Sequence, residues 1–511
     1  MLNSKKLAAF ISVAFVYTAN CAVAVETRGI SSSATPYLVA AASGVEITSL
    51  LTVGDTVNNK PDGTPYRMVG IPDGLGAFDN NDGTFTVLMN HELRNTVGVA
   101  RAHGGMGAFV SKWTINKSDL RVLHGEDLMK QVYLWDAQTG TWVATANSTF
   151  SRFCSADLPK VSAFYNKASK LGYQERIFMG GEENGTEGRA VAHIATGPNA
   201  GTSYELPALG KFSWENAVAN PHSQNKTVVM GTDDGQNGQV YVYIGMKQAS
   251  GNPVEQAGLR HGKLYGVKVN EVLDESRSSV IATTTFSLVD QGDVSSLSGA
   301  ALDAASETAG VTSFLRPEDG AWDSKNPNVF YFVTTDRYDQ TKDGVGTQEG
   351  HSRLYRLTFN DIEQAELGGT IETVIDGTGP TQMMDNITVN QKGNVLMQED
   401  VGGQFHNGKI WELETKAGIL TLLAQHDPAR FGEIGVAATA PFNNDEESSG
   451  IIEISDLLQG TKWHQGGYRY YLANVQAHYG ISGELVEDGQ LLLLAVPDKS
   501  EFKDQHDDAG E

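Results

Sequence analysis

The sequence predicts an all-β protein, and within that class a β-propeller with decorated loops. Glycine is abundant, at 56 of 511 residues, and stretches with helical periodicity are few. Short β-forming runs closed by Gly, Asn or Asp recur along the chain instead. Many short strands with turn residues between them are typical of a sandwich, a barrel or a propeller. A unit that repeats along the chain favours the propeller.

Four runs show the predicted strands clearly: residues 84–89, 239–244, 329–334 and 394–398. A loose unit repeats along the chain, in which a polar or Asp-Gly turn leads to an apolar strand and then to an acidic pair. Asn81-Asp82-Gly83 leads in this way to Asn90-His91-Glu92. In a propeller the inner strands of all blades end at the mouth of one central channel, so we expect such acidic ends to meet there. Long insertions, at residues 101–175 and 280–312, make the spacing irregular.

The two ends of the chain differ from its middle. Residues 1–24 are predicted to be a Sec signal peptide, because Lys5 and Lys6 precede an apolar stretch that ends at the small residues Ala22-Val23-Ala24. The apolar stretch is too short to span a bilayer, and no twin arginine precedes it. Residues 25–500 are predicted to form one propeller domain, and residues 501–511 a disordered acidic tail. The mature protein is therefore expected to be periplasmic or extracellular, without a membrane anchor.

The negative net charge of the chain limits the classes of molecule that it is expected to bind. The formal net charge is −24, and loss of Lys5 and Lys6 with the signal peptide would make it −26. Such an acidic chain is not expected to bind nucleic acid or anionic membranes. Cleavage would also remove Cys21 and leave Cys154 as the one thiol, so that no internal disulfide could form.

Acidic clusters are the candidate binding groups. Any one of them has an ordinary interpretation as a turn, because Asp and Asn hydrogen-bond to the local backbone. Glu-Glu and Glu-Asp pairs are not favoured turn residues, however, and adjacent carboxylates repel each other unless a cation lies between them. Oxygen-rich sites of this kind suit Ca²⁺. The clusters are Asn90-His91-Glu92, Glu182-Glu183-Asn184, Trp214-Glu215-Asn216, Asp233-Asp234, Arg316-Pro317-Glu318-Asp319, Asp385-Asn386 and Glu399-Asp400. They predict a cluster of metal ions at the channel mouth.

Two single residues suggest further chemistry. The rigid guanidinium of Arg316 matches a tetrahedral oxyanion, so this residue could bind a phosphate ester beside metal ligands. A loop salt bridge to Glu318 is an equally good interpretation. Cys154 has three interpretations. It is a buried apolar residue, a thiolate ligand to iron or zinc beside carboxylates, or a nucleophile whose partners are distant in sequence.

Several other hydrolytic chemistries are not indicated. The histidines show no His-x-His or His-x-x-x-His pair, so a zinc hydrolase built on histidines is not expected. The sequence contains no Gly-x-Ser-x-Gly elbow and no Gly-x-x-x-x-Gly-Lys phosphate loop completed by Ser or Thr.

The ordered series of these motifs resembles the PhoX family of bacterial alkaline phosphatases, over roughly residues 65–420. The longest matching stretches lie around residues 211–234, 316–336 and 384–400. The resemblance implies a monomeric propeller that hydrolyses small-molecule phosphate esters with an iron and calcium centre. It also implies roles for single residues. Cys154, Glu182, Glu215 and Glu318 would hold iron as Fe³⁺; Asn90, Glu92, Glu183 and Asp319 would serve Ca²⁺; and Arg316 would grip the substrate phosphate.

The chain departs from the family pattern at three places. Gly181 stands where the family commonly has a second cysteine, and Trp214 where it has a histidine. The family is typically exported with a twin-arginine signal, whereas this signal is of the Sec type. Two other functions therefore stay open: a non-catalytic, calcium-binding propeller that acts as a binding module, and a calcium-dependent propeller hydrolase that acts on phytate, a lactone or another ester.

Overall fold

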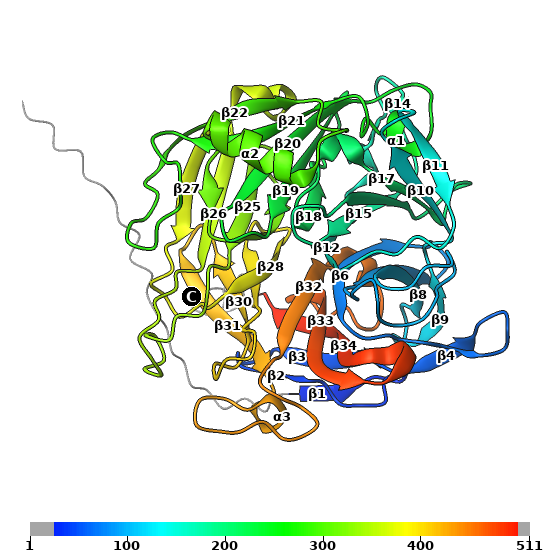
Figure 1. The fold of residues 1–511 in the computed structure, drawn as a ribbon. Helices are drawn as coiled ribbons and strands as arrows, with labels where there is room; N and C mark the ends of the chain where they lie inside the picture. Colours follow the sequence, from blue (N-terminus) through cyan, green and yellow to red (C-terminus); the bar gives the residue numbers. More distant parts are fainter. Residues whose placement is uncertain (1–24, 499–511) are drawn as a thin grey trace, which may run out of the picture.

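Six blades of β-strands stand around one central axis in the computed structural model, which describes residues 25–498 (Figure 1). Each blade contributes its innermost strand to a closed ring, because every inner strand contacts the inner strands of both neighbouring blades. The inner strands of blades 1 to 6 are β6 (Pro72–Asp79), β12 (Phe153–Asp157), β18 (Trp214–Ala219), β24 (Pro317–Trp322), β28 (Met384–Val389) and β32 (Glu447–Glu453). The predicted all-β propeller is confirmed.

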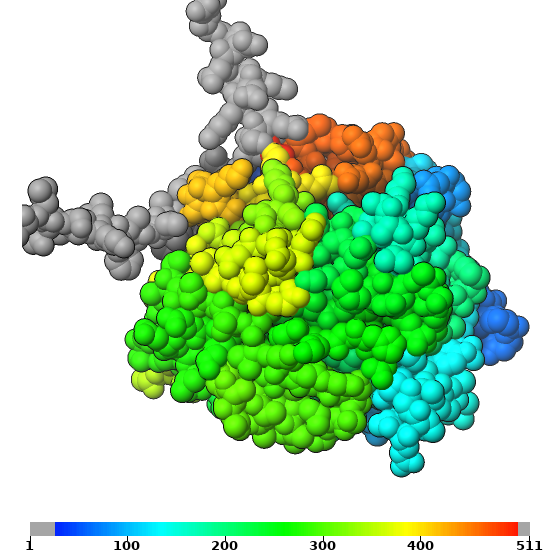
Figure 2. All heavy atoms as spheres, turned by 90° about the horizontal axis from the view of Figure 1, so that it is seen from above, coloured from blue at the N-terminus to red at the C-terminus, as the bar shows by residue number. Residues whose placement is uncertain are grey.

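The blades follow one another in sequence order, as the succession of colours around the ring shows (Figure 1). Figure 2 views the propeller from its rim, with green segments in the middle and cyan segments at one side. Outside its inner strand, blade 1 contains β7 (Thr84–His91), β8 (Phe109–Asn116) and β9 (Val122–Asp127). Blade 2 contains β15 (Ile177–Glu182), β16 (Ala190–Ile194), β17 (Thr202–Glu205), β10 (Gln131–Asp136) and β11 (Thr141–Thr145). Blade 3 contains β19 (Lys226–Asp233), β20 (Gly238–Met246), β21 (Lys263–Val269) and β22 (Thr284–Gly292).

The second half of the ring is built in the same way. Blade 4 contains β25 (Val329–Thr334), β26 (Arg353–Phe359) and β27 (Gly369–Ile375), and β27 pairs with β22 so that blades 3 and 4 form one continuous sheet. Blade 5 contains β29 (Val395–Glu399), β30 (Lys409–Glu414), β31 (Ile419–His426) and β2 (Leu38–Ala40). Blade 6 contains β33 (Tyr468–Ile481), β34 (Val486–Pro497), β3 (Glu46–Thr52) and β1 (Val25–Arg28).

Blade 6 closes the ring with strands from both halves of the chain. The early strand β3 pairs antiparallel with the late strand β34, with Ile47 opposite Leu494. Each inner strand is the edge of its sheet, and the closed ring protects these short edges by packing them around the channel.

The remaining elements are short and lie in the connections. The helices are α1 (Pro253–Gln256), α2 (Gly299–Ala309), α3 (Pro428–Phe431) and α4 (Ser455–Leu458). The short strands are β4 (Thr56–Asn59), β5 (Pro65–Arg67), β13 (Tyr165–Asn166), β14 (Leu171–Gly172) and β23 (Ser313–Phe314). None of the helices in residues 25–498 is long and apolar enough to cross a membrane.

The core consists of layers between neighbouring blades, and this explains the uninterrupted apolar runs in the sequence. On β20 the side chains of Tyr241 and Tyr243 enter one buried cluster, while those of Val240 and Val242 enter another on the opposite face. Successive residues of a strand point to opposite faces, and both faces of this strand are covered by a neighbouring blade. All four strands singled out in the sequence form, within β7, β20, β25 and β29. The predicted signal peptide and residues 501–511 lie outside the described residues.

Candidate metal centre

The inner strands place chemically similar side chains at the same position. The second residue of the inner strand is an acid or a thiol in blades 1 to 5 and a serine in blade 6, where an acid stands one residue earlier. These residues are Asp73, Cys154, Glu215, Glu318, Asp385 and Ser448, with Glu447 before the last. All of them are buried. We call the end of the channel where they lie the mouth.

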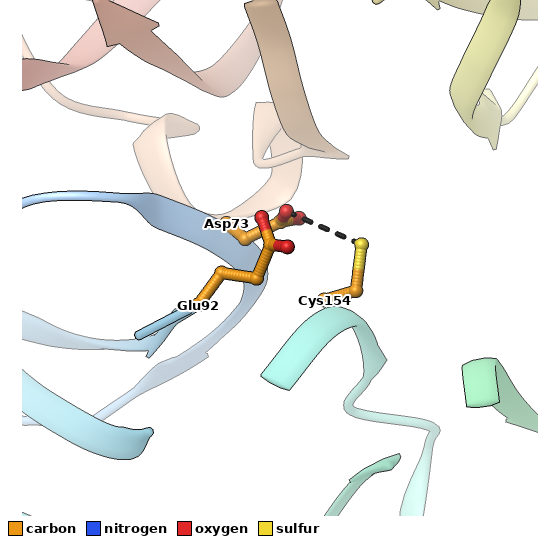
Figure 3. A group of neighbouring side chains, drawn as sticks. All are labelled: Asp73, Glu92 and Cys154. Carbon is orange, nitrogen blue, oxygen red and sulfur yellow. Dashed lines mark hydrogen bonds between the residues drawn. The ribbon is translucent and has the colours of Figure 1, made fainter. Parts of the chain in front are cut away.

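Five of these residues, together with Glu92 and Glu183, form three overlapping groups. Within each group, all ligand atoms lie within 4.8 Å of one another. The first group is Asp73, Glu92 and Cys154, whose side chains point toward one another from three strand ends (Figure 3). The second is Cys154, Glu183 and Glu215, and the third is Glu215, Glu318 and Asp385. Because Cys154 and Glu215 each belong to two groups, the three form one continuous row around the mouth.

A β-bulge explains why this position faces the channel. Every inner strand shifts its register against the second strand of its blade near its first residues. A bulge bends the strand and redirects one side chain. In blades 1 to 5 the shifts span Pro72 to Leu75, Phe153 to Ala156, Trp214 to Asn216, Pro317 to Gly320 and Met384 to Ile387, so each contains the residue that points into the mouth. In blade 6 the shift comes later, between Ser449 and Ile451, and this blade departs from the pattern.

A second set of acids comes from the second strands. Each second strand runs antiparallel to its inner strand, so its last residues reach the mouth where the inner strand begins. The residue that follows this strand is Glu92, Glu183, Asp234 and Asp400 in blades 1, 2, 3 and 5. The acidic pairs of the sequence therefore mark the ends of second strands, whereas the prediction assigned such ends to the inner strands.

Two arginines hold part of this acidic set. Arg316 donates from Nε to Asp234 Oδ1 at 2.8 Å and from Nη2 to Asp234 Oδ2 at 2.9 Å, and Nη2 lies 3.0 Å from Glu318 Oε1. Arg152 donates from Nε to Glu92 Oε1 at 2.6 Å, and its Nη2 is ion-paired with Glu183. Arg316 therefore forms the salt bridge to Glu318 that one interpretation predicted, and neither interpretation is excluded. Its bidentate partner, however, is Asp234.

Several buried oxygens at the mouth lack hydrogen-bond partners among the described residues. They are both carboxylate oxygens of Glu215 and one oxygen each of Asp73, Asp385 and Asn90. A buried polar group without a partner costs about 1–3 kcal/mol, and more when it is charged. Native proteins rarely leave such groups unpaired, and carboxylate oxygens aimed at a common point are the ligands of a cation. The residues present therefore fit a group of metal ions.

The electrostatics of the site also favour cations. Burial, with the repulsion of neighbouring carboxylates, raises the pKa of Asp73, Glu318 and Asp385 well above that of a free carboxyl. The same two effects raise the pKa of the Cys154 thiol. Burial opposes ionisation of Asp234 as well, but the Arg316 guanidinium more than offsets it and lowers the pKa of that carboxyl. A bound cation would stabilise the charged forms in the same way and replace the protons.

Glu182 was predicted to be an iron ligand, but the structure does not bring it to the mouth. Its carboxylate is paired with Arg189, at 2.5 Å from Nε to Oε2 and 3.0 Å from Nη2 to Oε1. Glu182 is the last residue of β15, and successive residues of a strand point to opposite faces. Glu183 therefore reaches the mouth, and Glu182 points away from it.

The substitution Glu182→Gln tests this placement. It would leave Arg189 without its buried partner, so we expect a loss of roughly 2 kcal/mol in the free energy of unfolding. We expect an unchanged metal content, measured by elemental analysis, because Glu182 lies outside the three groups. Loss of bound metal from a folded Glu182→Gln protein would contradict the placement.

Asp319 and Glu399 also have local partners. Asp319 accepts from Asn216 Nδ2 at 2.6 Å and from the amides of Gly320 and Ile387, and it thereby ties β18, β24 and β28 together. Glu399 accepts from Trp411 Nε1 and is ion-paired with His406, both at 2.8 Å. Asp319, predicted to bind calcium, is accordingly a bridge between inner strands in this structure. Of the predicted residues, Asn90, Glu92, Cys154, Glu183, Glu215, Glu318 and Arg316 do meet at the mouth.

Sequence reasoning missed Asp73 and Glu447. Asp73 has no acidic neighbour, so a search for acidic pairs could not find it. One signal was present: Ile71-Pro72-Asp73 and Arg316-Pro317-Glu318 both place an acid directly after a proline. In the structure these two segments are equivalent, since each begins an inner strand.

Two of the departures from the family pattern, Gly181 and Trp214, lie against each other. A Cβ atom built on Gly181 would lie 2.3 Å from Cβ and 2.7 Å from Cγ of Trp214, so this arrangement leaves no room for a side chain at 181. Trp214 is buried and stacks on Phe212 with ring centroids 3.9 Å apart. The indole therefore occupies the space beside Gly181.

The fold and the site together define a β-propeller with candidate metal-binding groups of buried carboxylates and one thiol at the channel mouth. A family model for the alkaline phosphatase PhoX matches residues 194–447. Over these residues the chain matches the family, in agreement with the resemblance of its ordered motifs.

Comparison with solved structures agrees with the fold. Pseudomonas fluorescens PhoX in complex with vanadate, a transition state analogue, matches at 12% identity with a TM-score of 0.59, over 90% of this chain and 96% of that one. A gluconolactonase from Xanthomonas campestris matches at 9% identity with a TM-score of 0.34, over 89% of this chain and 90% of that one. No curated protein matches the sequence.

Proposed function

We propose that the protein is an exported metal-dependent phosphatase that hydrolyses small phosphate esters at the propeller mouth. The observation that carries the proposal is the row of buried carboxylates and one thiol, in which oxygens of Asp73, Glu215 and Asp385 lack hydrogen-bond partners, in a chain that matches the alkaline phosphatase PhoX family. The predicted signal peptide at residues 1–24 supports export.

The donor atoms suggest which ions the groups hold. A thiolate beside carboxylates suits iron, and groups of oxygen ligands alone suit calcium. Cys154 with Glu183 and Glu215 is the proposed iron-binding group, and Glu318 and Asp385 extend it. Glu183 takes the place that the prediction gave to Glu182. Calcium is proposed beside the iron-binding group, at the carboxylates of Asp73 and Glu92, whose group also contains the Cys154 thiol, and at the unpartnered oxygen of Asn90.

The protein side chains have separate tasks in this proposal. The metal ions, when bound, would supply Lewis-acid charge at the oxygens of the phosphate ester. Arg316 lies at the edge of the metal groups, and its fork of N–H donors fits two phosphate oxygens. To bind phosphate it must shift part of its hydrogen bonding from Asp234. The buried acids hold the cations in a fixed array, so little reorganisation is needed when charge develops on the phosphate.

Elemental analysis and turnover test the proposal together. Protein purified from its own secretory route should contain iron and calcium, and it should hydrolyse phosphomonoesters at alkaline pH until a chelator is added. Calcium without turnover would support the binding-module alternative. Calcium with turnover of a lactone, phytate or another ester, and none of simple phosphomonoesters, would support the third function.

The substitution Arg316→Gln tests the proposed clamp. We expect kcat/KM for a phosphomonoester to fall about 10²–10³-fold, the usual cost of losing one preorganised donor to a transition-state oxyanion. Arg316→Lys should recover part of the loss, because it restores the charge without the fork. Iron and calcium contents should stay unchanged in both variants. Full activity of the Arg316→Gln protein would show that Arg316 forms a structural salt bridge and does not bind the substrate.

A further inference from the structure

A second arginine at the mouth repeats the position of Arg316. Arg152 stands directly before the inner strand of blade 2, and Arg316 directly before that of blade 4. Both have left-handed backbone angles, with φ of 52° for Arg152 and 60° for Arg316. Their carbonyls accept equivalent hydrogen bonds from the residue that follows the second strand, at 2.8 Å from Glu183 and 3.0 Å from Thr335. The two arginines therefore occupy the same place in two blades.

Both guanidinium groups cover buried acids from the solvent side. The side chain of Arg152 is 34% exposed and that of Arg316 is 33% exposed, whereas their carboxylate partners are exposed by 8% or less. Each arginine binds its acids through Nε and Nη2. Neither Nη1 makes a hydrogen bond to the described residues, so each arginine keeps donors for a ligand that arrives from solvent.

The two arginines belong to one belt of charged side chains, in which each arginine lies between two acids. In blade order it runs from Glu92 through Arg152, Glu183, Asp234 and Arg316 to Glu318. Glu183 and Asp234, in its middle, are close enough to interact electrostatically. Glu92, Glu183 and Glu318 also belong to the three metal groups, so the arginines lie beside the cations that these groups would hold.

We propose that Arg152 is a second phosphate-binding residue, which acts with Arg316 to favour phosphate monoesters over diesters. The inference rests on the proposed phosphatase function. A monoester carries nearly two negative charges above its second pKa of about 6, and it has three non-bridging oxygens. A diester carries one charge and has two such oxygens. A second guanidinium therefore stabilises a bound monoester more than a bound diester, because the monoester offers it an additional charged oxygen as a hydrogen-bond acceptor.

Arg189 provides a matched control. It lies in the same blade as Arg152 and is also paired with a buried glutamate, Glu182, but that pair lies outside the metal groups. We expect Arg152→Gln to lose about tenfold or more in kcat/KM for p-nitrophenyl phosphate, and less than about threefold for bis-p-nitrophenyl phosphate. Arg189→Gln should change the ratio of the two activities little. Arg152→Lys should keep an intermediate preference for the monoester.

A protection experiment on the unaltered, metal-loaded enzyme avoids any dependence on variant folding. Phenylglyoxal modifies accessible arginines, and mass spectrometry reports which ones. Vanadate or inorganic phosphate should slow modification of Arg152 and Arg316 but not that of Arg189. An unchanged rate at Arg152, or an Arg152→Gln protein with the same monoester preference as Arg189→Gln, would overturn the inference.

The outcomes separate this inference from the proposed function. If the metal-loaded enzyme hydrolyses no phosphoester, the proposed function fails, while protection of Arg152 by vanadate still reports whether it binds the anion. If Arg152→Gln loses its metals or does not fold, the protection result decides. If vanadate or phosphate does not protect Arg152, this residue only holds Glu92 and Glu183 in place, and the inference is wrong.

Discussion

Replacing Glu215 by glutamine is expected to abolish phosphatase activity and to stabilise the metal-free protein. Glu215 belongs to two of the three metal groups, and both of its carboxylate oxygens are buried without hydrogen-bond partners. The amide has one oxygen and no negative charge, so we expect iron to be lost and kcat/KM to fall at least about 10³-fold. Without metal, removal of an unpaired buried acid should raise the free energy of unfolding by about 1–3 kcal/mol.

Opposite effects on function and stability distinguish a ligand from a structural acid. Thermal unfolding in the presence of a chelator measures the gain, and it should be larger at pH 9 than at pH 6, because burial raises the pKa of Glu215 and ionisation at high pH penalises the unaltered protein. Glu182→Gln is the control, since it should lose stability and keep its metals. A Glu215→Gln protein that retains iron, or that unfolds more easily without metal, would contradict the assignment.

Metal removal is expected to reverse the pH dependence of stability. Burial and then the nearby Asp400 carboxylate raise the pKa of Glu447 to about 8, and burial with neighbouring carboxylates raises the pKa of Asp73, Glu318 and Asp385 well above that of a free carboxyl. In the unfolded chain these groups titrate near pH 4. Between about pH 4 and pH 8 the folded, metal-free protein therefore binds more protons than the unfolded chain. Its free energy of unfolding must then fall as pH rises through this window.

The size of the effect is large because several acids contribute. One pKa unit corresponds to about 1.4 kcal/mol, so the mouth as a whole should cost the metal-free protein several kcal/mol between pH 5 and pH 8.5. In the loaded protein, cations replace the protons, and acid should instead destabilise it by competing for the ligands. Thermal unfolding at pH 5 and pH 8.5, with chelator and with iron and calcium, measures both trends. A metal-free protein that is more stable at pH 8.5 would show that the mouth acids do not behave in this way.

Much of the site could be predicted because its acidic residues can be recognised from their immediate neighbours in the sequence. A second strand ends in a turn, and an acid beside that turn is visible as a neighbour of the strand, as with Glu92 after β7 and Asp234 after β19. Pairs such as Glu182-Glu183 are visible because ordinary turns do not favour them. Three-dimensional convergence of these acids could be expected from the propeller alone, since all blades share one axis.

The errors came from features that depend on side-chain direction. Glu182 and Glu183 are adjacent and chemically identical, and the pleat of β15 alone decides which of them faces the mouth. Asp319 directly follows the ligand Glu318 and turns to Asn216 and to backbone amides because of the bulge in β24. Asp73 stands alone in the sequence and joins the candidate metal groups only because β6 lies beside β12 in the ring.

The sequence by itself determined the strand pattern, the propeller class, the acidic and thiol chemistry and the resemblance to a phosphatase family. These depend on composition, on period-two patterning and on short-range neighbours, which a chain carries before it folds. Only the tertiary structure decided which acids meet, that Cys154 lies between two metal groups, and that Arg152 and Arg316 are equivalent. Those results depend on bulges and on closure of the ring, which set side-chain direction through contacts between residues hundreds of positions apart.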